Sequence, residues 1–284
     1  MTPIHRTRTA RRIRRRLEIL RATHRWRPAT TTLAASGNVI HVDPRDARGW
    51  EIVRGLGRGH QPALIDLWRR AVVAQEPLLA VDVGANYGEM VLSGSYGPSC
   101  TVLAVEPNPG VAALLRKSLS VHPDRDRIEL LECLLSDEDG GTTVLHIDPR
   151  WSGSASASPH GDRPIEVTVG VRTLDSITAD RPAADRLLLK IDAEGWEAQV
   201  LGGMAAALDA AASLVAIIEF DPDHLRRAGT DPGSLFERLA GLGPGWSVAY
   251  DGALAPCGAP PTEPTDLLIV SDPEVARRLG VPLP

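Results

Sequence analysis

The fold of this chain is decided at residues 78–88, which read LLAVDVGANYG. The apolar run from Leu78 to Val83 predicts a buried strand, and Gly84 and Gly88 allow the backbone to approach a ligand closely before a helix begins. Carbonyl groups at such a strand end and amides at the helix start supply hydrogen bonds to a bound molecule. We therefore expect a ligand site directly after this strand, with Asp82 available to a cationic group.

Strand-like and helix-like patterns alternate around this segment. Short apolar runs occupy residues 101–105, 128–134, 187–191 and 214–219, and amphipathic helical patterns occupy residues 62–75, 111–119, 196–208 and 233–242. Such alternation is typical of parallel βαβ units. Strand candidates at 246–250 and 266–270, joined by the Pro-rich stretch 255–264, predict an antiparallel edge hairpin. The predicted fold is α/β, with a mostly parallel seven-stranded sheet and helices on both faces.

A weaker pattern lies between the apolar runs at residues 128–134 and 187–191. Strand candidates at residues 143–147 and 166–171 flank the segment 151–164, which is rich in Ser, Gly and Pro. This composition predicts a flexible loop. The sequence has no internal repeats, so we expect one catalytic domain.

Charge divides the chain into two parts. Residues 1–27 carry ten arginines against the single acid Glu18, and the remainder is acidic. We expect an Arg-rich N-terminal helical extension and linker at residues 1–38 and a Rossmann-like domain at residues 39–284. The extension could bind nucleic acid or anionic lipid, or dock on the domain or on a second copy of the chain. The acidic body, and the lack of aromatic residues among the arginines, argue against nucleic acid.

Targeting and cysteine signals exclude several classes of protein. No apolar segment of a secretory signal follows the arginines, and no uncharged run of about 18 residues could span a membrane. We expect a soluble, cytoplasmic protein with no membrane partner. Cys100, Cys133 and Cys257 lack the spacing of a zinc site or of a disulfide framework.

Acidic and polar residues follow the next two apolar runs. Glu106 lies 24 positions after Asp82 and can accept hydrogen bonds from both hydroxyls of a ribose. A dinucleotide-binding enzyme would use the same acid, but its G-x-G-x-x-G turn is absent. Ser136 and Asp137 precede a Gly-Gly turn, a suitable place for an adenine edge.

Three carboxylates lie close together after the apolar run at residues 187–191. Residues 190–197 read KIDAEGWE. Asp192 falls at the carboxyl edge of the predicted sheet, where ligands gather in open α/β folds. Glu194 and Glu197 have a second explanation, because acids at a helix start gain about 0.3–1 kcal/mol each from the helix dipole. That explanation accounts for Asp192 less well.

Six segments, in their order and spacing, resemble the signature of the FkbM methyltransferases. They are Asp82 to Gly88, Glu106-Pro107-Asn108-Pro109, Thr173-Leu174-Asp175, Lys190 to Gly195, Leu201-Gly202-Gly203 and Ile218-Glu219. The resemblance spans roughly residues 43–270 and is most specific at 190–195, since most Rossmann-like methyltransferases share the first glycine motif. The Arg-rich extension and the segment 151–164 are not part of the pattern, and the helix after Gly88 is short.

The resemblance implies a class I methyltransferase fold and S-adenosylmethionine as cofactor. By this resemblance the cofactor-binding residues are Asp82, Gly84, Ala85, Asn86, Tyr87, Gly88, Glu106, Asn108, Ser136, Asp137 and Asp192, with residues 192–194 beside the transferred methyl group. Family members commonly methylate hydroxyls, often on sugars. The implied acceptor is therefore a glycosylated small molecule of secondary metabolism, or a glycan.

Methyl transfer to a hydroxyl requires an aligned acceptor that loses its proton. We take Asp192 or Glu194 as the candidate base, with Glu219 and His224 as competing candidates. In a variant of this mechanism, Asp192 and Glu219 hold a divalent cation such as Mg²⁺, because hard cations choose oxygen ligands. Trp151 is a candidate wall of the acceptor pocket, since aromatic faces pack well on sugar rings.

Three other functions stay open on the sequence alone. A carboxylate or amine of a small molecule or peptide could be the acceptor, and a carboxylate would need no strong base. The Arg-rich extension could belong to an RNA-binding or RNA-modifying protein. The domain could also bind the cofactor without catalysis, although the carboxylates near the expected methyl site would then have no purpose.

Overall fold

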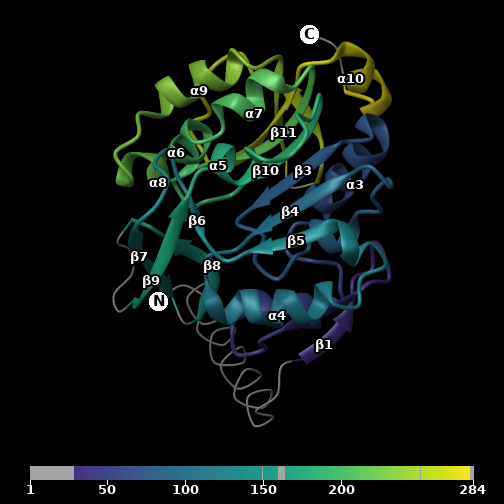
Figure 1. Cartoon of the computed structure of the whole chain (residues 1–284), viewed down its shortest axis with the longest axis vertical. Helices are drawn as coiled ribbons and strands as arrows, with labels where there is room; N and C mark the ends of the chain where they lie inside the picture. Colours follow the sequence, from purple (N-terminus) through teal and green to yellow (C-terminus); the bar gives the residue numbers. More distant parts are fainter. Residues whose placement is uncertain (1–28, 149, 159–163, 250, 282–284) are drawn as a thin grey trace, which may run out of the picture.

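A computed structural model of the chain describes residues 29–148, 150–158, 164–249 and 251–281 (Figure 1). The helix expected in the Arg-rich extension lies outside these residues. The stretch after Pro28, expected to be part of a linker, instead contains strand β1 (Ala29–Thr32), which pairs antiparallel with β2 (Val39–Val42). Helix α2 (Ala47–Arg54) follows this hairpin.

The main sheet confirms the predicted α/β class. Its strand order is β13-β12-β14-β11-β10-β3-β4-β5. The parallel strands are β3 (Leu79–Val83), β4 (Thr101–Val105), β5 (Ile128–Leu131), β10 (Arg186–Ile191) and β11 (Ser213–Phe220). The strands joined by antiparallel pairing are β12 (Gly245–Val248), β13 (Leu254–Pro256) and β14 (Thr265–Val270).

The sheet has eight strands, one more than the predicted seven. The additional strand is β13, which begins just before the stretch expected to join the hairpin strands and pairs with β12 at the edge of the sheet. An edge position tolerates Pro256, because the missing N–H is not needed on the side that has no neighbouring strand.

Helices cover both faces of this sheet (Figure 1). Alternate residues of a strand point to opposite faces. Leu188 therefore packs in the cluster that contains α3 (Pro62–Gln75), α4 (Pro109–Leu119) and α10 (Pro273–Leu279), whereas Leu189 packs with α6 (Glu197–Gly202), α7 (Ala205–Ala210), α8 (Pro222–Arg227) and α9 (Pro232–Ala240). The remaining helical segments are α5 (Leu174–Thr178) and the 3-10 turns η1 (Val91–Ser93) and η2 (Arg125–Arg127).

The helix expected over residues 196–208 is divided into α6 and α7. Gly203 separates them, and a Cβ at this position would collide with the carbonyl oxygen of Ser136. Close packing of the backbone against the end of the neighbouring strand β6 (Leu134–Leu135) therefore interrupts the helical pattern.

A second sheet, of four strands, lies beside the carboxyl end of the main one in the order β6-β9-β7-β8 (Figure 1). It contains β7 (Thr142–Asp148), β8 (Trp151–Ser156) and β9 (Ile165–Arg172). The flexible loop predicted for residues 151–164 is wrong at 151–156, which form β8. Its Ser152 and Ser156 are buried. Their hydroxyls tolerate burial because they donate hydrogen bonds to the Asp46 carboxylate and the Glu194 carbonyl, respectively. Residues 159–163 lie outside the described residues.

Within the described part of the chain, no helix combines the length and the apolar character needed to cross a membrane.

Burial in the central strands should dominate the stability of the domain. Val215 on β11 is fully buried, whereas Val73 on α3 is 76% exposed. We expect Val215→Ala to lower the free energy of unfolding by about 2 kcal/mol, through lost apolar burial and an unfilled cavity. The matched Val73→Ala should change it by less than about 0.5 kcal/mol. Urea titration monitored by circular dichroism measures both, and equal losses would contradict this packing.

Candidate active site

A pocket opens at the carboxyl ends of β3, β4 and β10. Its lining comes from the strand ends, from β6 and the residue before it, and from β8, α2 and α6. It includes Arg48, Gly84, Asn86, Glu106, Leu134, Ser152, Asp192 and Glu194. This is the edge at which open α/β sheets bind ligands. The structure therefore brings together residues from four distant parts of the sequence.

Gly84 allows β3 and β10 to approach each other at the pocket. Its φ is +76°, and a Cβ there would collide with the carbonyl oxygen of Asp192. Gly88 has a different task, because a Cβ at that position would collide with Leu115 on α4. Only the first of these two glycines thus lines the ligand pocket, and the second permits helix packing.

Glu106 is held rigidly at the end of β4. One carboxylate oxygen accepts the amide of Asn86 at 2.7 Å and the other accepts the amide of Asn108 at 2.8 Å. Burial raises the pKa of Glu106 to about 7, against the lowering effect of these two hydrogen bonds. Each oxygen keeps a further lone pair for a ligand hydroxyl.

Several residues expected to bind the cofactor make structural contacts within the protein. The Asn108 side chain caps α4 by accepting the amides of Gly110 and Val111, and the Tyr87 hydroxyl donates to Asp46 at 2.9 Å. Neither residue is among those lining the pocket, nor is Ala85, which is buried within the turn. Backbone and helix geometry account for these three positions.

Ser136 and Asp137 also lie outside the lining of the pocket. The Ser136 hydroxyl donates to Asp137 at 3.0 Å and accepts the indole N–H of Trp196 at 3.3 Å, while Asp137 is exposed. In this part of the pocket the lining comes from residues 133–135, just before them. The predicted contacts of Ser136 and Asp137 with the cofactor therefore stay a prediction, and the two residues follow directly after the lining residue Leu135.

Lys190 joins the buried Asp82 to the partly buried Asp192 at the centre of the site. Its Nζ lies 3.0 Å from Asp192 Oδ2 and 3.9 Å from Asp82 Oδ1. Burial raises the pKa of Asp82 to about 6 against the attraction of Lys190. Burial acts in the same direction on Asp192, but Lys190 and Arg48 outweigh it and lower the pKa of that carboxyl. Asp192 is therefore a weak base in this structure.

Arg48 is a pocket residue that the sequence did not reveal. It comes from α2, far from the glycine turn along the chain, and its guanidinium lies 2.9 Å from the buried carboxylate of Glu89. Asp46, the cap of α2, accepts hydrogen bonds from Ser152 and Tyr87, so α2, β8 and the glycine turn form one network. An arginine in a short helix carries no local signal of such a role.

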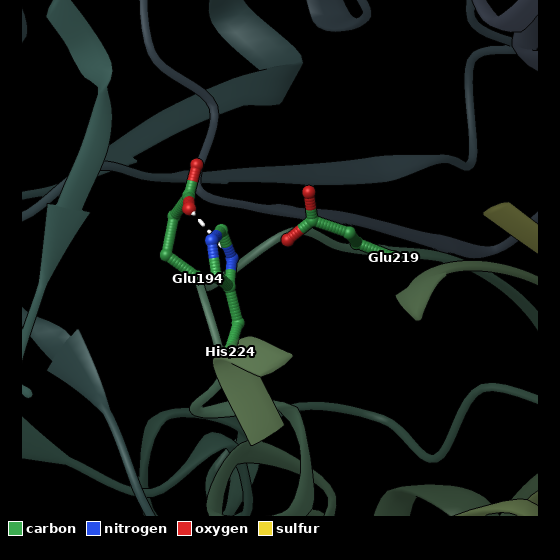
Figure 2. Close-up of side chains that lie close together, drawn as sticks. All are labelled: Glu194, Glu219 and His224. Atoms are coloured by element: carbon green, nitrogen blue, oxygen red, sulfur yellow. Dashed lines mark ion pairs between the residues drawn. The ribbon is translucent and has the colours of Figure 1, made fainter. Parts of the chain in front are cut away.

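Glu194, Glu219 and His224 lie together beside the pocket (Figure 2). Glu194 Oε2 is 3.0 Å from His224 Nδ1, and Glu219 projects from the end of β11 toward the same imidazole. The pKa of Glu219 is raised well above its usual value by burial and by neighbouring carboxylates, and the pKa of His224 is raised by Glu194. All three were candidate catalytic residues in the sequence.

The backbone around Glu194 is shaped for this contact. Glu194 has a φ of +54°, and a Cβ at Gly195 would approach the carbonyl oxygen of His224 to 2.5 Å. Glu197, which the sequence would explain as a helix-start acid, is buried and accepts the amides of Ala193 and Gly195. The Glu197 carboxylate therefore fixes the turn that presents Glu194. The left-handed backbone conformation of Glu194 is of a kind that clusters at functional sites.

The family follows from the sequence that builds this pocket. The model of the Methyltransferase FkbM domain matches residues 82–243, more than half of the chain, and these residues include the glycine turn, Glu106, Asp192 and the Glu194 cluster. The chain belongs to the FkbM methyltransferase family. No curated protein matches the sequence.

Solved structures similar to this FkbM methyltransferase include three methyltransferases. They are the O-methyltransferase TomG from Streptomyces achromogenes, involved in tomaymycin synthesis and in complex with SAM (15% identity, 75% of this chain and 80% of that chain, TM-score 0.42), an O-methyltransferase from Bacillus cereus in complex with SAH (12%, 78% and 88%, 0.44), and a methyltransferase from Geobacter sulfurreducens (17%, 75% and 79%, 0.40). The family assignment rests on the sequence match alone.

Lys190, the buried ammonium group of this FkbM methyltransferase, should be essential for stability. We expect Lys190→Met to lower the free energy of unfolding by about 3–5 kcal/mol, because Asp82 and Asp192 would lose the cation that lies between them. Adding Asp192→Asn should recover part of the loss. Lys117 is the only other lysine and is exposed, so Lys117→Met should cost less than about 0.5 kcal/mol. Similar urea midpoints for the two lysine variants would refute this role.

Proposed function

We propose that this FkbM methyltransferase transfers the methyl group of S-adenosylmethionine to a hydroxyl of a small molecule. One observation carries the proposal. A single pocket at the carboxyl edge joins Gly84 and Glu106, on the side suited to a nucleoside, to Asp192 and Glu194, on the side suited to an acceptor. A reaction between two ligands needs such a shared space, in which both are held in line.

The residues on the nucleoside side fit the cofactor. The free lone pairs of the Glu106 carboxylate suit the two ribose hydroxyls, and the apolar wall formed by Pro107 and residues 133–135 suits the flat adenine ring. Arg48 offers a guanidinium at the same pocket for an aminoacyl carboxylate. When bound, S-adenosylmethionine supplies an electrophilic methyl group on a sulfonium sulfur.

On the acceptor side the chain must help a hydroxyl to lose its proton, because alcohols are poor nucleophiles at neutral pH. A nearby base or a cation can do this. Asp192 is less suited to either role, since Lys190 pairs with its carboxylate. A magnesium site made of Asp192 and Glu219 is disfavoured for the same reason. We therefore assign acceptor activation to the cluster of Glu194, Glu219 and His224.

We further propose that the hydroxyl belongs to a sugar of a secondary metabolite or glycan. The resemblance to FkbM enzymes that methylate sugars supports this class. Trp151 on β8, the expected wall of an acceptor pocket, adds no support: its ring packs edge-on against His60, with centroids 5.2 Å apart, and it is not among the residues lining the pocket.

Binding of S-adenosylmethionine should depend on an ionised Glu106. Ribose hydroxyls donate to the carboxylate, whose pKa of about 7 means that raising the pH ionises it. We expect the affinity measured by calorimetry to rise about tenfold from pH 6 to pH 8. Glu106→Gln should bind more weakly at pH 8 and lose this dependence.

The exposed Glu138→Gln serves as the matched control and should behave as wild type. NADH should not bind. Failure of both S-adenosylmethionine and S-adenosylhomocysteine to bind the wild-type protein would overturn the assignment of the cofactor.

Glu194 should contribute to turnover rather than to cofactor binding. We expect Glu194→Gln to lower kcat by about 10²-fold or more while the affinity for S-adenosylmethionine stays within about twofold. Release of S-adenosylhomocysteine, measured with a panel of glycosides and of matched carboxylates and amines, tests this. Turnover confined to the carboxylates or amines would argue against an O-methyltransferase.

A further inference from the structure

We propose that Glu194, Glu219 and His224 form a binding site for a divalent first-row transition-metal ion beside the pocket. Binding of the ion follows from the geometry of these three side chains alone. Its role toward an acceptor oxygen rests on the proposed function.

The first argument is the convergence of donor atoms. Each of the three residues offers one ligand atom, and these atoms all lie within 4.8 Å of one another. Among the described residues, no other group of three or more His, Cys, Asp or Glu meets this condition. The residues come from the turn after β10, the end of β11 and helix α8. Figure 2 shows the two carboxylates on either side of the imidazole ring.

The second argument is that two of the donor atoms are buried without a hydrogen bond. Within the described part of the chain, Glu219 Oε2 and His224 Nδ1 are buried and make no hydrogen bond. The Glu194 carboxylate lies at an ion-pair distance of 3.0 Å from His224 Nδ1. Unsatisfied buried polar atoms are costly and rare in native proteins. A cation held between these groups would satisfy them together.

The third argument is the excess of negative charge. Glu219 lies among four further carboxyl groups, those of Asp192, Glu194, Glu197 and Asp266, and Asp266 stands opposite it on β14. The nearby cations are engaged elsewhere, because Lys190 pairs with Asp192 and Arg48 pairs with Glu89. The His224 imidazole is also drawn toward Asp221, 3.6 Å from its Nε2. A divalent ion would offset this charge more fully than a single imidazolium.

The donor set defines the class of ion. One imidazole nitrogen with two carboxylates suits Mn²⁺, Fe²⁺ or Zn²⁺, whereas Mg²⁺ favours oxygen ligands and retains its waters. Three protein ligands also leave coordination positions open, as in catalytic metal sites. Because Glu194 lines the pocket as well, an ion at this site would border the acceptor, where it could bind the hydroxyl oxygen and lower its pKa.

The test is calorimetric titration of the EDTA-treated full-length protein with MnCl2 and with ZnCl2, alongside the EPR signal of free Mn²⁺. We expect one site per chain. Glu219→Gln and His224→Asn should each weaken binding by about 10- to 100-fold or more. The control is Asp223→Asn, since Asp223 is exposed and pairs with Arg226 on the same helix. This variant should bind as wild type.

Circular dichroism spectra verify that each variant is folded, and S-adenosylmethionine is titrated into the same samples. Absence of binding by the wild-type protein up to about 1 mM of either ion, or binding that the two ligand variants leave unchanged, would overturn the proposal. Metal binding without cofactor binding would support the site and contradict the proposed function. Cofactor binding without metal binding would have the opposite meaning.

Discussion

Lys190 lies between Asp82 and Asp192 in the interior of the sheet, where burial alone would drive both carboxyls toward their neutral forms. The parallel register of β3 and β10 creates this contact by placing Lys190 opposite Asp82. The same register brings the Asp192 carbonyl against Gly84, so that the two strand ends meet without a side chain between them. The position of the pocket depends on this junction, because residues directly after β3 and directly after β10 line it.

The segment from Lys190 to Glu197 divides its tasks among neighbouring residues. Lys190 provides the positive charge beside the carboxylates of the interior, and Asp192 lines the pocket. Glu194 reaches His224 from a left-handed backbone conformation. Glu197 stabilises that conformation by accepting two amides of the turn. Glu194 and Glu197, which a helix start alone could explain, thus have separate roles inside the site.

The pocket is completed by parts of the chain outside the matched FkbM domain. Arg48 comes from α2, before residue 82, and Asp46 ties α2 to Ser152 on β8 through a buried hydrogen-bond network. This network also reaches the glycine turn through Tyr87. Helix α2 and strand β8 therefore close a site whose base is built from parallel strands and their carboxyl ends.

The sequence by itself determined the alternation of strands and helices in the main sheet, the glycine turn after β3 and the acids at strand ends, because periodicity and turn chemistry are local properties. Only the tertiary structure decided which side chains meet. Register and packing between distant elements placed Arg48 in the pocket, gave Asn108 a capping role and made Ser152 part of a buried strand. They also brought Glu219 and His224 to Glu194, a proximity in space that no local pattern encodes.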